Sequence, residues 1–238
     1  MNYRSLDHTC ITRTAETLAA RVESRFPANG LNGVAQALVV LARDAAKDAE
    51  DLAKPVWWLR ALTALCVIAG AMVFIFIGTF ISFDRISTGA FEFVSGVEAS
   101  INTIVLSIVG FLTLAKSEER IKRKKVLEGL HRLRSVIHVI DMHQLTKDPD
   151  ALSANFKPTA ASPSRIMDPQ QLARYLDYCS EMFSITGKLA ALYAQAVNDE
   201  VVAGAVNDIE SLGSNLSRKV WQKIMLIDAK VGRRSKGA

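Results

Sequence analysis

The sequence predicts an all-α membrane protein: a two-helix transmembrane hairpin with N-terminal amphipathic helices and a C-terminal cytoplasmic helical bundle. Half of the 238 residues are hydrophobic, and two windows, residues 61–83 and 99–115, contain no charged residue. A helix needs ~20 apolar residues to cross a hydrocarbon core of ~30 Å. Elsewhere the apolar residues recur every three or four positions, and strand-like alternation is absent, which is typical of amphipathic helices.

Residues 1–55 are predicted to form cytoplasmic amphipathic helices. Ile11, Leu18 and Val22 share one helix face, and Val34 and Leu38 begin a second helix over residues 34–53. Two Asn-Gly pairs within residues 27–33 are turn formers and are expected to separate the helices. A cleaved signal peptide is not expected, because residues 1–56 are polar and amphipathic.

Residues 56–115 are predicted to form the transmembrane hairpin, with spans at about 61–83 and 99–115. A buried core helix explains the first window badly and the second, shorter window passably. Trp57 and Trp58 stand at the inner end of the first span, where indole rings favour the headgroup region. Packing of both tryptophans in a protein core is the alternative. The intervening residues 86–98 are expected at the outer interface.

The distribution of Lys and Arg predicts that both termini are cytoplasmic. Basic residues flank the hairpin, whereas residues 82–98 contain only Arg85. We therefore expect a multi-pass membrane protein, with anionic lipid as partner rather than nucleic acid. The residues expected to contact lipid headgroups are Trp57, Trp58, Arg60, Lys116, Arg120, Lys122, Arg123, Lys124 and Lys125.

The remaining chain divides into four predicted segments. Residues 116–145 form a basic juxtamembrane helix that can continue the second span, with a heptad seam from Val126 to Ile140. Residues 146–167 contain three prolines and are expected to be a flexible linker. Residues 168–229 form a helical pair that starts at an Asp168-Pro169 cap and carries a second seam from Met182 to Ala196. Residues 230–238 are a basic, disordered tail.

A stripe of small and polar residues marks one face of the second span. Its members are spaced by four and three residues, so they share a helix face where another helix can approach closely. That face either closes the hairpin or lines a pore. The helix-packing or pore-lining candidates are Gly96, Ser100, Thr103, Ser107 and Gly110, with Asn102 beside them.

No residue pattern predicts an enzyme, a cofactor or a metal site. His131, His138, His143 and Asp141 lie on one predicted helix, but their spacing does not place three ligands together. Metal binding or catalysis by His138 and Asp141 is the least favoured hypothesis. Phosphate-binding and nucleophile motifs are also missing from the sequence. Three widely spaced cysteines, Cys10, Cys66 and Cys179, are expected to be free thiols.

Two stretches, residues 138–149 and 216–226, resemble segments of a family of bacterial two-span membrane proteins with a helical cytoplasmic region. The resemblance covers the second span and the cytoplasmic helices. No activity is attached to that family, so the resemblance implies a bacterial inner membrane and no functional residue.

Two hypotheses about function follow. The first is a membrane anchor or scaffold that presents a helical cytoplasmic module for self-association or binding of a protein partner through the seams. The alternative is an oligomeric channel or membrane-perturbing effector gated by the cytoplasmic helices.

Overall fold

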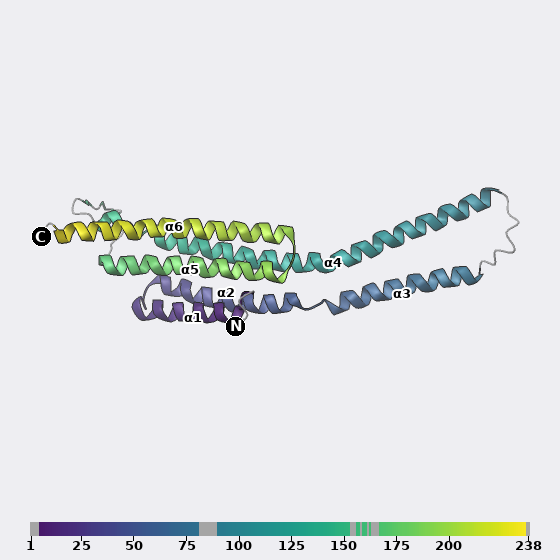
Figure 1. Ribbon diagram of the computed structural model, residues 1–238, viewed down its shortest axis with the longest axis horizontal. Helices are drawn as coiled ribbons and strands as arrows, with labels where there is room; N and C mark the ends of the chain where they lie inside the picture. Colours follow the sequence, from purple (N-terminus) through teal and green to yellow (C-terminus); the bar gives the residue numbers. More distant parts are fainter. Residues whose placement is uncertain are drawn as a thin grey trace. The chain divides into compact units, whose positions relative to one another are not determined.

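The computed structural model describes residues 5–80, 90–152, 156–157, 159–160, 162 and 167–236. All regular structure in these ranges is helical, which confirms the all-α prediction (Figure 1). The elements are α1 (His8–Arg25), α2 (Gly30–Ala53), α3 (Trp57–Phe80), α4 (Ala90–Leu145), the short 3-10 helix η2 (Pro149–Leu152), α5 (Pro169–Ala196) and α6 (Glu200–Lys236). Residues 1–53 and 125–238 form one compact unit, here called the helical module, and residues 54–124 form the other, the α3–α4 unit.

The helical module brings together helices from the two ends of the sequence. α5 and α6 are antiparallel and share the most extensive contact, while α1 and α2 pack against each other and against α5 (Figure 1). An ion pair supports each arrangement: Arg21 of α1 meets Glu181 of α5 at 2.8 Å, and Arg43 of α2 meets Glu16 of α1 at 2.6 Å. Both pairs are exposed, so they add only a little stability.

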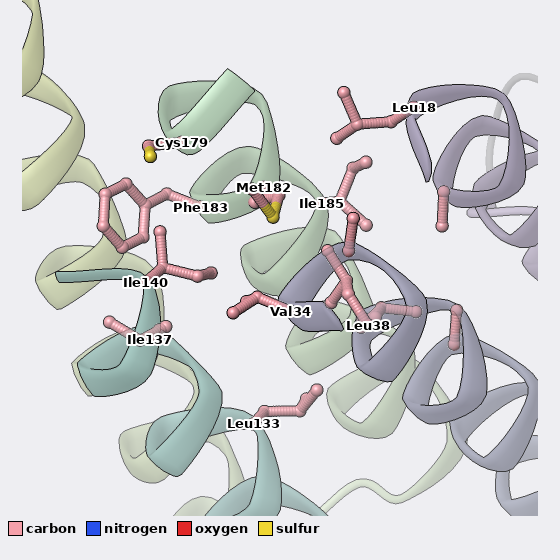
Figure 2. Close-up of a cluster of buried hydrophobic side chains, with 14 of the residues drawn as sticks. Leu18, Val34, Leu38, Leu133, Ile137, Ile140, Cys179, Met182, Phe183 and Ile185 are labelled. Carbon is pink, nitrogen blue, oxygen red and sulfur yellow. The ribbon is translucent and has the colours of Figure 1, made fainter. Parts of the chain in front are cut away.

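The core of the module is built from α1, α2, α5, α6 and the last part of α4, whose apolar faces meet. Figure 2 shows Leu38 of α2, Ile137 of α4 and Phe183 of α5 in one cluster. The two seams lie in this core. Their buried members are Val126, Leu130, Leu133, Ile137 and Ile140 in α4, and Met182, Ile185, Leu189 and Leu192 in α5, all at most 4 % exposed. The seams are therefore filled by the chain's own helices and leave no open stripe for self-association.

Local signals at three helix starts explain where the helices begin. Asp168 caps α5 by accepting from the Gln171 N–H at 2.7 Å, with proline at the first position, as the sequence predicts. Asp199 accepts from the Val202 N–H at 3.1 Å and starts α6. Asp7 caps α1 in the same way.

The start of α2 differs from the prediction. The helix begins at Gly30, so the Asn-Gly pair at residues 32–33 lies in its first turns instead of in the loop. Asn29 provides the reason, because its side chain accepts from the Leu31 N–H at 3.1 Å and takes the cap position. Burial of Leu31, which is 0 % exposed, then holds the first turn against the core.

Two segments predicted to be irregular are more ordered where they are described. At the start of the predicted linker, η2 is held by Lys230 of α6, whose Nζ is 3.1 Å from Pro149 O and 2.5 Å from Asp150 Oδ1. α6 continues to Lys236, through most of the predicted disordered tail, because no proline interrupts it and η2 anchors it. Linker residues 153–155, 158, 161 and 163–166 lie outside the described residues.

A polar cluster joins α2, α4 and α5 at the edge of the module core. Asp48 accepts a hydrogen bond from Tyr193 Oη at 3.1 Å and forms ion pairs with Lys125 at 3.0 Å and Arg132 at 3.2 Å. The Asp48 side chain is only 14 % exposed, so these partners offset the cost of removing a charge from water. Gly129 lets the Tyr193 ring lie directly on α4, since a Cβ at this position would overlap the phenol.

Candidate membrane-contacting surface

Large apolar side chains are exposed along α3. They include Leu65, Ile68, Met72 and Ile75, each more than half exposed. The stretch Gly30–Met72 contains one helical window long and apolar enough to cross a membrane, and only 6 % of that window is buried. The structure divides this stretch, because α2 ends at Ala53 and α3 begins at Trp57. The exposed apolar side chains named here belong to α3.

The first part of α4 also exposes large apolar side chains. Its exposed apolar residues are Ile101, Ile104, Val105, Leu106, Ile108, Val109, Phe111 and Leu112, between 44 % and 72 % exposed. Because Ile104, Val105 and Leu106 are consecutive, they point in different directions around the helix. An amphipathic core helix would hide one face and keep polar residues on the other. This segment instead exposes apolar residues on several faces.

Trp57 and Trp58 open α3 and are 74 % and 63 % exposed. Their rings are therefore not packed in the protein core within the described structure. The turn that follows them is regular, since the Leu59 and Arg60 N–H groups both donate to Val56 O at 3.1 Å. Two exposed indoles at the start of an exposed apolar helix form an arrangement suited to a membrane–water interface.

Glu118 of α4 ties the start of α3 to α4. Its carboxylate accepts from the Val56 N–H at 3.3 Å and from Arg60 Nε at 3.2 Å, and it pairs with Lys122 Nζ at 3.1 Å. Burial raises the pKa of Glu118, but the hydrogen bonds from Lys122, Val56 and Arg60 outweigh burial and leave the pKa below its ordinary value. Glu118 is thus held ionised between two cations. The sequence pattern does not single it out, because Glu118 and Glu119 stand within a run of basic residues.

An apolar groove lies beside this ion cluster, between α3 and α4. It has a volume of about 450 Å³. Its walls are formed by Leu59, Ala64, Val67, Ile68 and Leu114, and Arg60, Thr63 and Glu118 complete the lining. Thr63 Oγ1 donates to Leu59 O at 2.8 Å, so its hydroxyl is already paired within α3.

The basic residues predicted to contact headgroups fall into different environments. Lys116, Arg120 and Lys124 are exposed on α4. Lys125 belongs to the helical module, where it pairs with Asp48 at 3.0 Å and Asp51 at 3.5 Å. Burial lowers the pKa of Lys125, but the two carboxylates outweigh it and raise the pKa above its ordinary value. Lys125 therefore has a structural role within the chain.

The predicted stripe on α4 is described only in part. Asn102, Ser107 and Gly110 are exposed, and a Cβ built at Gly110 would meet no atom within 4 Å. Gly70 of α3 has the same open surroundings. At these two glycines no helix lies in close contact within the described structure. Gly96, Ser100 and Thr103 lie in α4, but their side chains are outside the described residues.

The histidines of α4 do not gather into a site in the described structure. His131 and His138 are exposed, whereas His143 is partly buried, with Nδ1 3.3 Å from Tyr175 Oη. Burial, and then the charge of Lys147, lower the pKa of His143. Asp141 accepts from Gln144 Nε2 at 2.6 Å. Among the described residues no group of three His, Cys, Asp or Glu side chains could hold a metal ion.

Together these features define a class: an all-α protein with an exposed apolar helix of membrane-spanning length. No family model, curated protein or solved structure matches the chain. The resemblance to a family of bacterial two-span proteins therefore stays a prediction.

Proposed function

We propose that the protein is an integral membrane anchor whose two spans, residues 61–83 and 99–115, hold the helical module at the cytoplasmic face. The observation that supports this proposal most strongly is the exposure of large apolar side chains on α3 and on residues 101–112 of α4. In water, such surfaces would cost free energy in proportion to their area, at roughly 25 cal/mol per Å². A bilayer removes that cost.

The orientation of the hairpin follows from its charges. Lys116, Arg120 and Lys124 are exposed close to one end of the second proposed span, whereas residues 82–98 contain one basic residue. Basic residues resist translocation, so the proposal places both termini in the cytoplasm and residues 82–98 outside.

Cysteine accessibility tests the proposed topology. In a variant whose native cysteines are replaced by serine, a cysteine at Ser95 is expected to react with an impermeant thiol reagent in intact cells. A cysteine at Ser153 is expected to react only after permeabilisation. The reverse pattern would overturn the orientation, and release of the protein by alkaline carbonate would overturn the membrane anchor itself.

The module side of the proposal is self-association, and it requires a surface other than the buried seams. On α6, Trp221 is 52 % exposed and Met225 is 68 % exposed. Exposed tryptophan and methionine are common in protein interfaces. Mass measurement of the native complex in nanodiscs tests this step: we expect an oligomer for the wild type and a smaller species for Trp221→Glu. A monomeric wild type would leave only the anchoring role.

An oligomeric channel is the second candidate function. It is favoured by Asn102, an exposed polar residue within an apolar segment of α4. A polar side chain facing lipid is costly unless another helix or water satisfies it. Ion flux into liposomes would support the channel if Ser107→Leu reduced it. Absence of flux, with Ser107→Leu equal to the wild type, would remove this candidate.

A further inference from the structure

The groove between α3 and α4 has one polar end and one apolar side. Arg60 and Glu118 lie at the polar end, and Val67, Ile68 and Leu114 line the apolar part. An acyl chain needs an apolar channel of this kind, and the volume of about 450 Å³ falls in the range of ~300–1,000 Å³ found for small-molecule sites. The surroundings are apolar as well, since Ile68 and Leu65 are exposed.

The charges at the polar end fit a phosphate. Arg60 and Lys122 are positive and Glu118 is negative, so the three groups carry a net charge of +1. Arg60 donates to Glu118 through Nε, which leaves the two terminal amino groups of its guanidinium for another acceptor. The Arg60 side chain is 59 % exposed, whereas the Glu118 side chain is 17 % exposed. The cation therefore faces outward and the carboxylate behind it fixes its position.

Guanidinium groups bind phosphate oxygens through paired, charge-assisted hydrogen bonds. A neighbouring indole belt at Trp57 and Trp58 would place this end of the groove at headgroup depth. We propose that the groove binds one anionic phospholipid, with an acyl chain along Ala64, Val67 and Ile68 and the phosphate on Arg60. Glu118 is a positioning residue that orients Arg60. This inference rests on the proposed membrane anchor, because only a membrane brings such a lipid to the groove.

The test uses the full-length protein in nanodiscs of phosphatidylcholine mixed with phosphatidylglycerol, followed by native mass spectrometry of the released protein. The wild type is expected to retain one phosphatidylglycerol in preference to phosphatidylcholine. Arg60→Gln removes the phosphate contact, and Ala64→Trp fills the groove. Each change is expected to reduce the retained phosphatidylglycerol about tenfold, the loss that one charge-assisted contact or one blocked pocket produces. Arg13→Gln, at an exposed arginine of α1 outside the groove lining, removes the same charge and is expected to match the wild type.

Equal retention by Arg60→Gln and Arg13→Gln, or full retention by Ala64→Trp, would overturn the lipid site. Equal retention of both lipids by the wild type would overturn it too. Alkaline carbonate extraction of the same proteins separates this failure from failure of the anchor: a wild type that stays in the membrane without a preferred lipid contradicts the groove alone. A wild type that is extracted contradicts the anchor and the groove together.

Discussion

Gly129 lies on α4 where the phenol ring of Tyr193 crosses the helix. Tyr193 is 1 % exposed and bonded to Asp48, so it cannot move aside easily. Gly129→Ala is expected to lower the free energy of unfolding by ~1–3 kcal/mol, the usual cost of overpacking. Gly204→Ala is the control, because Gly204 lies in α6 with no atom near its Cβ position. It should raise stability by ~0.5–1 kcal/mol through helix propensity.

Urea unfolding followed by circular dichroism measures both changes in the same detergent. A Gly129→Ala protein as stable as Gly204→Ala would show that Tyr193 does not lie on the α4 backbone in solution.

The lowered pKa of His143 makes the stability of the folded protein depend on pH. Burial and Lys147 lower its pKa in the folded state below the ordinary value of 6.5. The unfolded chain therefore binds a proton first as the pH falls below 6.5, and the folded state loses stability through that window. In His143→Gln the loss of unfolding free energy between pH 7 and pH 5.5 should be smaller. His131→Gln, at an exposed position on α4, should retain the wild-type slope. Equal slopes for all three proteins would contradict the burial of His143.

At the scale of the elements, α4 changes character along its length. Near its end Ile137 is 0 % exposed in the module core, whereas Leu106 is 72 % exposed. Ile137→Ala should lower the free energy of unfolding of the module by ~2–5 kcal/mol, because a cavity remains. Leu106→Ala should leave the module unchanged. Hydrogen exchange of α5 amides reports on the module directly, and faster exchange in Leu106→Ala than in Ile137→Ala would contradict this assignment.

The sequence predicted the faces of the helices but not what covers them. The spacing of Val126 to Ile140 shows that these residues share a face, and the structure buries that face. Periodicity is the same whether α5 of the same chain or a second copy supplies the contact, so the sequence could not exclude self-association there. For the same reason the stacking of Tyr193 on Gly129, which joins positions far apart in the chain, left no local pattern to find.

The helix cap at Asp168 was easier to predict from the sequence than the extent of the loop before α2. Asp168 and Pro169 act within one helical turn, so their effect is local and was predicted correctly. The sequence predicts a loop at the Asn-Gly pair of residues 32–33, because this dipeptide favours turns. The structure places the pair in α2, because burial of Leu31 in the core outweighs the turn propensity. The groove beside Arg60 could not be predicted, because it depends on the approach of α3 and α4 near Glu118.

At the scale of the whole molecule, the helical module contains residues 1–53 and 125–238 but not the apolar segment between them. Lys125 Nζ lies 3.5 Å from Asp51 Oδ2, so the two pieces meet close to the junction. A chain in which a Gly-Ser linker replaces residues 54–124 should therefore fold without detergent into a helical protein that unfolds cooperatively. Light scattering and circular dichroism check this.

Residues 125–238 alone provide the control for that experiment. Without α1 and α2 they would expose Leu133 and Met182, which are buried in the complete core, so aggregation is expected. A soluble fragment of 125–238, together with an aggregated linker protein, would contradict the shared core.

Because the core contains helices from both ends of the chain, the module cannot be completed until the last helices have been synthesised. α1 and α2 are made first, yet α5, which packs against both, follows more than a hundred residues later. At ~5–20 residues per second, that interval lasts roughly 6–23 s. During it, the apolar faces that contain Leu18 and Leu38 have no α5 to pack against. Under the proposed topology, membrane insertion precedes completion of the module, and a nonsense mutation within α5 would leave an inserted protein whose N-terminal helices are open to chaperones and proteases.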